Sequence, residues 1–262
     1  MTGVKRMEYQ TLRLKREKLA VRLQIYRPEA SNSINGCLID EMLVVMRELE
    51  QDASVKVVAL EGLPEVFCTG MDFDEVARDI RAARLEHFDP DAYFSLLKLF
   101  SQTSKVVVSL IEGKVNAGGI GFVASSDLAI ASEKAVFSLS EALFGLLPAC
   151  VLPFLVRRTG FQKAHWLTLT TQSISAKRAY EIGLVDEYGD VQDLFRRYLL
   201  RVSRLEPKTV QNLKAYMNTL WEIGTETQQR AVDRITSLVH DPEVQGNIQH
   251  YVAEGVFPWA KR

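Results

Sequence analysis

The sequence has little of what a disulfide scaffold, a zinc protein or a membrane protein needs. Three cysteines, Cys37, Cys68 and Cys150, stand far apart in 262 residues, an odd number without the paired spacing of a metal site. No apolar core follows the basic N-terminus, and no apolar run reaches the length of a membrane span. We therefore expect a cytoplasmic protein that folds without disulfides, metal or membrane.

The chain also has no excess of charge of one sign, since it contains 32 lysines and arginines and 33 aspartates and glutamates. A chain so close to neutral has no field that favours nucleic acid or an anionic membrane. The glycine motifs of dinucleotide and P-loop sites are absent as well. Hydrophobic residues make up 47% of the chain, enough for a large core, and a buried organic ligand fits this composition best.

Apolar periodicity predicts an alternation of strands and helices. Residues 8–26 alternate on both sides of a charged "KREK", which indicates a hairpin, while "VKVVALEG" and "KVVVSLIEG" indicate buried strands. "DLAIASEKAVFSLS" predicts two more strands. Helices are predicted at 38–49, 91–101 and near 117–126. This order favours a mixed α/β core.

From about residue 160 the pattern is almost wholly helical, and no linker separates this part. We expect it to pack on the core or on a neighbouring subunit. The tail "YVAEGVFPWAKR" is expected to dock on its own chain, with a partner contact as the alternative.

Two glycine-rich segments follow predicted strands, "VFCTGMDF" at 66–73 and "KVNAGGIGF" at 114–122. Glycine lets a ligand approach backbone N–H groups closely, and the second segment opens a helix whose first N–H groups lack internal partners. Two such donors aimed at one oxygen form an oxyanion hole. The alternative is that these glycines serve only tight turns and close packing of helix on sheet.

Five segments, in this order and spacing, resemble the crotonase (enoyl-CoA hydratase/isomerase) superfamily: "RPEASNSIN", "VFCTGMDFDEV", "GKVNAGGIGFVASSDLAIAS", "AVFSLSEALFGLLPACVLPFLVRRTG" and "SAKRAYEIGLVDEY". Finer details, such as "GKVNAGG" and the "FPW" tail, look like the dehydratases of polyketide β-branching cassettes. The resemblance implies an α/β (α+β) crotonase fold of repeated ββα units in two roughly perpendicular sheets. It places this core in residues 1–200 and a helical trimerisation region in 201–262.

The resemblance also assigns roles to single residues. The N–H groups of Met71 and Gly118 would form the oxyanion hole, and Glu141 matches one of the two catalytic glutamates of enoyl-CoA hydratases. Gly121 stands where the other should be. One carboxylate can still remove the C2 proton and return it to the departing hydroxyl, and its apolar surroundings should raise its pKa. The alternative for Glu141 is an ordinary helix N-terminal residue after a Ser138 or Ser140 cap.

Other site residues are supported less strongly. Asp72 is either a second acid–base or a turn carboxylate, and Asn116 either bonds the substrate or satisfies its own turn. Further residues expected to contact the substrate are Ala30, Cys68, Gly70, Gly119 and Gly121, although Cys68 and Cys150 also fit a packing role. A distal substrate carboxylate could bind Tyr93, Lys98 or His240.

The implied reaction is dehydration of 3-hydroxy-3-methylglutaryl on an acyl carrier protein to the 3-methylglutaconyl thioester. It needs no cofactor beyond the phosphopantetheine of the carrier or CoA, and the family implies a homotrimer or hexamer. A decarboxylase of the 3-methylglutaconyl thioester on the acyl carrier protein, a CoA-level enoyl hydratase and a non-catalytic crotonase-like subunit remain as alternatives.

Overall fold

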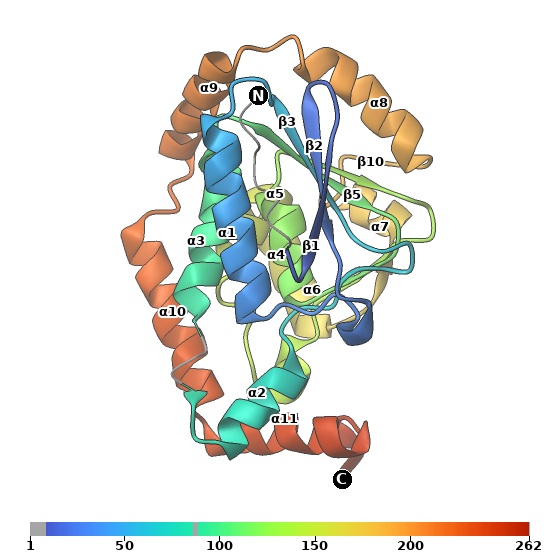
Figure 1. Cartoon of the computed structure of the whole chain (residues 1–262). Helices are drawn as coiled ribbons and strands as arrows, with labels where there is room; N and C mark the ends of the chain where they lie inside the picture. Colours follow the sequence, from blue (N-terminus) through green and yellow to red (C-terminus); the bar gives the residue numbers. More distant parts are fainter. Residues whose placement is uncertain (1–8, 86–88, 262) are drawn as a thin grey trace.

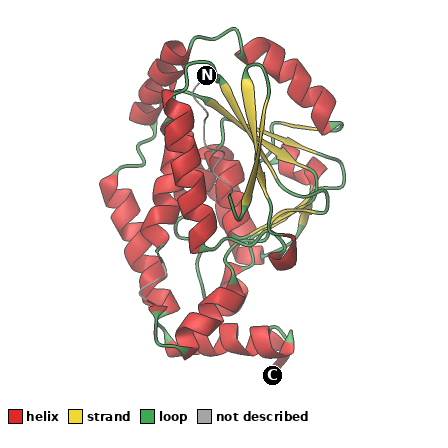
Figure 2. Ribbon diagram, in the orientation of Figure 1, coloured by secondary structure: helices red, strands yellow, loops and turns green. Residues whose placement is uncertain are grey.

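In the part of the chain that the structure describes, six strands form the larger of two β-sheets (Figure 1 and Figure 2). The computed structural model describes residues 9–85 and 89–261. The strand order is β1 (Leu12–Arg16), β2 (Ala20–Ile25), β3 (Val57–Glu61), β5 (Val106–Ile111), β7 (Leu128–Ala131) and β10 (Glu187–Tyr188). The first two strands are antiparallel, which confirms the predicted hairpin, and the remaining pairs are parallel.

The central strands of this sheet are buried on both faces. Helix α1 (Gly36–Gln51) turns seven buried side chains toward the main core on one face. Helix α8 (Val191–Val202) covers the other face, where Leu194 and Phe195 join a second cluster of buried side chains from β3, β5 and β7. Strands covered on both sides need continuous apolar residues rather than alternation, which is why "VKVVAL" and "KVVVSLI" are uniformly hydrophobic.

The smaller sheet has the order β4 (Val66–Cys68), β6 (Lys114–Asn116), β8 (Val136–Ser138) and β9 (Ile174–Ser175), the first three parallel. Its first three strands follow β3, β5 and β7 of the larger sheet in turn, and each of the three is followed by a helix. The sequence runs β3, β4, α2 (Phe73–Arg81), then β5, β6, α4 (Gly118–Ser125), then β7, β8 and the 3-10 helix η3 (Glu141–Phe144). The mixed α/β fold with two sheets is confirmed, and the carboxyl ends of β4, β6 and β8 lie side by side.

The other helices enclose these sheets. They are η1 (Pro28–Ala30), α3 (Pro90–Gln102), α5 (Leu152–Thr159), α6 (Phe161–Thr170), α7 (Ala176–Glu181), α9 (Pro207–Leu220), α10 (Thr225–Val239), α11 (Pro242–Glu254) and η4 (Pro258–Lys261). The prediction of a helical second half is largely confirmed. It is interrupted by β9 and β10, whose two residues each are too few to produce an alternating pattern.

The C-terminal helices pack back on the same chain. Helices α9 and α10 contact α3, while α11 contacts α2 and η3 (Figure 1). In the tail, the Phe257 ring lies 5.8 Å from Phe144 and 5.0 Å from Tyr251, centroid to centroid, so the expected docking on its own chain is confirmed. Among the residues described, no helix has the length and apolar character to cross a membrane.

Candidate active site

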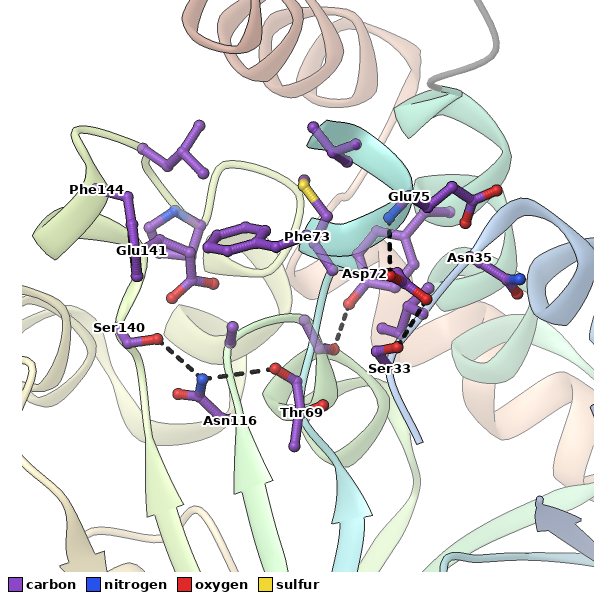
Figure 3. A pocket seen from close by; sticks show the side chains of 18 of the residues that line it. Ser33, Asn35, Thr69, Asp72, Phe73, Glu75, Asn116, Ser140, Glu141 and Phe144 are labelled. Carbon is purple, nitrogen blue, oxygen red and sulfur yellow. Dashed lines mark hydrogen bonds between the residues drawn. The ribbon is translucent and has the colours of Figure 1, made fainter. Parts of the chain in front are cut away.

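A cavity of about 890 Å³ opens at the carboxyl ends of the small sheet. The loops after β4, β6 and β8 contribute Met71, Gly118 and Glu141 to its wall. Figure 3 shows side chains from these loops facing a common hollow. Ligands of sheets with parallel strands characteristically bind outside the carboxyl ends of the strands, and the three residues predicted to do chemistry are brought together at this place.

The loop after β4 is held so that the Met71 N–H stays available. Ile34 pairs with Met71 in an isolated parallel bridge. The N–H of Ile34 donates to the Gly70 carbonyl at 2.7 Å, and the N–H of Asp72 donates to the Ile34 carbonyl at 3.0 Å. These bonds use the groups on either side of the Met71 N–H and leave it without an acceptor among the described residues, as an oxyanion donor requires.

The second predicted donor belongs to the first residue of α4, and the two loops touch. A Cβ added to Gly70, which has φ +85°, would lie 2.9 Å from the Gly118 nitrogen and 2.6 Å from the Ala117 Cβ. Only glycine fits at position 70. Ala117, immediately before α4, has φ +49°, a strained conformation of the kind that gathers at functional sites. As a helix N-terminal group, the Gly118 N–H has no acceptor within α4.

Glu141 is the first residue of η3, and its carboxylate is set in an apolar part of the wall. Its Oε2 atom is buried and has no hydrogen-bond partner among the described residues. Burial raises the pKa of Glu141 to about 7, although the N–H groups of Glu141 and Ser140 act in the opposite direction. Ser140 makes no side-chain cap to η3, so the alternative of an ordinary capped helix start has no support in these contacts.

Asp72 is buried and already fully engaged with the protein. It caps α2 by accepting from the Glu75 N–H at 3.0 Å, pairs with Arg27 at 2.9 Å and accepts from the Ser33 hydroxyl at 3.0 Å. Burial alone would raise the pKa of Asp72, but these bonds outweigh it and hold the pKa below its ordinary value. These contacts favour the turn and capping role over that of a second acid.

Asn116, the last residue of β6, lines the same cavity. Its side-chain nitrogen donates to the Ser140 hydroxyl at 2.9 Å and reaches the Thr69 carbonyl at 3.5 Å (Figure 3). Its Oδ1 accepts from the Ser138 hydroxyl at 2.8 Å. Partners on the two neighbouring segments, after β4 and at the end of β8, go beyond the turn role expected as the alternative. Direct contact with a substrate stays a prediction.

Of the other residues expected to contact substrate, Ala30 lines the cavity. Cys68, Gly70, Gly119 and Gly121 lie behind its wall, where they allow close packing. A Cβ on Gly119 would meet the Cys68 carbonyl oxygen at 2.6 Å. Burial raises the pKa of Cys68 to about 12, which keeps its thiol protonated and suits a packing role.

Three residues were expected to bind a distal carboxylate of the substrate, and the structure places only one of them in the described cavity wall. Tyr93 lines the cavity, but Lys98 and His240 are not among its described lining residues. The Tyr93 hydroxyl donates to the Gly118 carbonyl at 2.5 Å. Lys114 is the one lysine or arginine in the described part of the wall. Its position in "GKVNAGG", at the start of the strand that ends at Asn116, is the signal that could have identified it.

Sequence reasoning also missed an aromatic wall supplied from distant segments. Phe73 packs edge-on against Phe144 at 4.8 Å, and Tyr251 packs on both. Together with Phe257 they line the cavity. These residues come from α2, η3, α11 and the tail, so no local pattern connects them.

Comparison with known proteins agrees with this geometry. The family model for enoyl-CoA hydratase/isomerase matches residues 16–262. The chain is 43% identical over 252 residues to the bacillaene synthase dehydratase PksH of Bacillus subtilis (strain 168), covering 96% of this chain and 97% of that protein. A crystal structure of a pksH polyketide biosynthesis enoyl-CoA hydratase from Bacillus subtilis matches with a TM-score of 0.92 and 42% identity, over 96% of this chain and 100% of that one.

A more distant structure, AtuE of Pseudomonas aeruginosa, matches with a TM-score of 0.77 and 28% identity, over 97% of this chain and 100% of that one. The family match spans nearly the whole chain and includes every segment that suggested the resemblance. The chain belongs to the enoyl-CoA hydratase/isomerase, or crotonase, family.

Proposed function

We propose that this enzyme is a dehydratase of polyketide biosynthesis that removes water from a carrier-bound 3-hydroxy-3-methylglutaryl thioester and yields the 3-methylglutaconyl thioester. The observation that favours this most is Glu141: its Oε2 is buried and unpartnered, and burial brings its pKa to about 7. A group that must accept and release a proton in each turnover works best with a pKa near the working pH. Similarity to a bacillaene synthase dehydratase supports the same reaction class.

In the proposed mechanism the thioester oxygen accepts from the N–H groups of Met71 and Gly118. The Glu141 carboxylate removes the proton from C2, and the electron pair moves into the thioester as an enolate held by these two donors. The enolate then re-forms the thioester carbonyl and the C2–C3 double bond, while the C3–O bond breaks. Glu141 returns its proton to the departing hydroxyl, which leaves as water. Each oxyanion donor typically stabilises such a transition state by about 3 kcal/mol.

The glutamate pair of enoyl-CoA hydratases is half missing here, because only Glu141 of the two positions carries a carboxylate. Gly121 brings no side chain, and Asp72 is ionised and bonded to Arg27 and Ser33. Neither offers a second carboxylate to activate water. This supports the dehydratase over the CoA-level hydratase, whereas a decarboxylase or a non-catalytic subunit is distinguished by experiment.

For the carrier we propose an acyl carrier protein. Its phosphopantetheine arm carries one phosphate, and Lys114 is available in the wall for that phosphate or for the distal carboxylate of the acyl group.

We further propose a homotrimer. Helix α9 has an exposed apolar stripe of Leu213, Tyr216, Met217 and Leu220 at helical spacing, which the exposed Trp221 directly after the helix continues. Such a stripe favours burial against another subunit.

The test is to incubate the enzyme with the 3-hydroxy-3-methylglutaryl thioester on an acyl carrier protein and, separately, on CoA. Mass spectrometry of the acyl group distinguishes loss of water from loss of carbon dioxide. Loss of water, faster from the carrier protein than from CoA, is the expected result. The 3-methylglutaconyl thioester is incubated in parallel: loss of carbon dioxide from it, without loss of water from the hydroxy thioester, would indicate the decarboxylase instead, and no change in either thioester on either carrier would indicate a non-catalytic subunit.

A further inference from the structure

The smaller sheet places the Asn116 side chain between the segments that bear the three residues of the proposed mechanism. Strand β6 is the middle strand of β4, β6 and β8, and Asn116 is its last residue, in register with Ser138 of β8. The loop after β4 bears Met71, the chain after β6 bears Gly118, and the loop after β8 bears Glu141. A side chain at the carboxyl end of the middle strand can therefore reach both neighbours.

Asn116 does reach both of them. On the β8 side its amide binds the hydroxyls of Ser138 and Ser140, at 2.8 and 2.9 Å, directly before Glu141. On the β4 side its nitrogen points to the Thr69 carbonyl at 3.5 Å, two residues before Met71. Figure 3 shows this arrangement, with Asn116 between Ser140 and Thr69.

The orientation of the amide follows from its partners. The Thr69 carbonyl can only accept, so the side-chain NH₂ must face it, whereas a serine hydroxyl can donate or accept. Two amide protons then match two acceptors, Ser140 and Thr69, and Oδ1 takes the Ser138 proton. No amide proton remains for a substrate.

We propose that Asn116 is a positioning residue that fixes the Glu141 loop relative to the two oxyanion N–H groups, acting through Ser140 and Thr69 rather than on the substrate. The proposal rests on the proposed function of Glu141, Met71 and Gly118. It differs from the direct substrate contact that the sequence suggested for Asn116.

The first test needs no turnover. Carbon-13 NMR of labelled glutamate, assigned with Glu141→Gln, follows the titration of Glu141 in the wild type, Asn116→Ala and Ser140→Ala. Both variants should lower the pKa of Glu141, because a released loop lets water reach the buried carboxylate. Ser140→Ala removes only one hydroxyl, so it provides the answer where Asn116→Ala fails to fold. An unchanged titration in a folded Ser140→Ala would overturn the proposal.

The second test is a double-mutant cycle in the dehydration assay. Each single variant should lower kcat by about 10- to 100-fold, as for a misplaced catalytic group, with little change in KM, and the double variant should be no slower than the worse single one. A raised KM in Asn116→Ala together with a normal Ser140→Ala would overturn the proposal and indicate substrate contact.

Ser132→Ala is the matched control, because the Ser132 hydroxyl donates to the Glu112 carbonyl at 2.7 Å outside the cavity. It should leave both kcat and the Glu141 titration unchanged. If the wild type turned over no thioester, the proposed function would fail, while the NMR titration would still decide whether Asn116 positions Glu141.

Discussion

Gly121 lies directly against the hydroxyl of Tyr93. A Cβ at position 121 would come within 2.2 Å of the Tyr93 hydroxyl oxygen and 3.0 Å of the Leu97 Cδ1. The same hydroxyl donates to the Gly118 carbonyl. Tyr93 of α3 therefore fills the space that a side chain at position 121 of α4 would need. Its bond to Gly118 also holds the first turn of α4, which begins with a proposed oxyanion donor.

Gly121→Ala should destabilise the protein by about 1–3 kcal/mol, the usual cost of overpacking a core. The new methyl group must displace the Tyr93 hydroxyl and break its bond to Gly118. Urea unfolding measures the loss. Adding Tyr93→Phe to Gly121→Ala removes the atom that clashes, so the second substitution should cost less in that background than in the wild type. Strictly additive costs would argue against the contact.

Glu141 should make the protein less stable as the pH rises from about 4.5 to about 7. Burial raises its pKa from 4.5 to about 7, so within this window the folded chain holds the proton more tightly than the unfolded chain does. Ionising the carboxylate then lowers the free energy of unfolding by at most about 3 kcal/mol. Urea unfolding at pH 5 and pH 8 should show this decrease in the wild type and not in Glu141→Gln. The same decrease in both would refute the assignment.

Lys214 should anchor α9 to the core. Its buried ammonium lies 2.6 Å from Asp127 and donates to the carbonyls of Phe100 and Lys105 at 3.2 and 2.8 Å. Lys214→Met would leave the buried Asp127 without its cation and the two carbonyls without the ammonium donor, at a cost of about 3 kcal/mol. Lys208→Met, an exposed lysine on the same helix, should change the free energy of unfolding by less than about 0.5 kcal/mol. Equal effects would show that α9 is not held by this pair.

The apolar stripe on α9 should be a subunit contact. Leu213 and Leu220 are 56% and 63% exposed in the single chain, and a glutamate at each should prevent its burial against a partner. Size-exclusion chromatography with light scattering should report a trimer for the wild type and a smaller species for Leu213→Glu/Leu220→Glu. Gln211→Glu, exposed on a different side of α9, should keep the trimer. A wild type that is already monomeric would contradict the assignment.

Much of the fold was predictable because long elements produce clear patterns. The helical repeat of Leu38, Met42, Val45, Met46 and Leu49 predicts α1, and all five are buried. Helix α2 was missed because only Val76 and Ala77 of its nine residues are buried, which is too few to form an apolar stripe. Strands β4 and β6 have three residues each, so the sequence indicated only the glycine turns that follow them.

The site was predictable where local sequence determines the chemistry. A lone acid in "SLSEALFGLL" predicts a raised pKa for Glu141, and the structure supports this direction. The partners of Asn116 and the contact of Tyr93 with Gly121 depend on segments 22 to 47 residues apart. No spacing rule connects such residues, so these relationships appear only in three dimensions.

The most direct test of the mechanism compares the wild type with Glu141→Gln in single turnover of the carrier-bound 3-hydroxy-3-methylglutaryl thioester, with loss of water followed by mass spectrometry. We predict dehydration by the wild type and a rate lower by about 10²- to 10⁴-fold in Glu141→Gln, with unchanged binding of the carrier-bound substrate. Equal rates of water loss would contradict the assignment of Glu141 as the acid–base of the reaction.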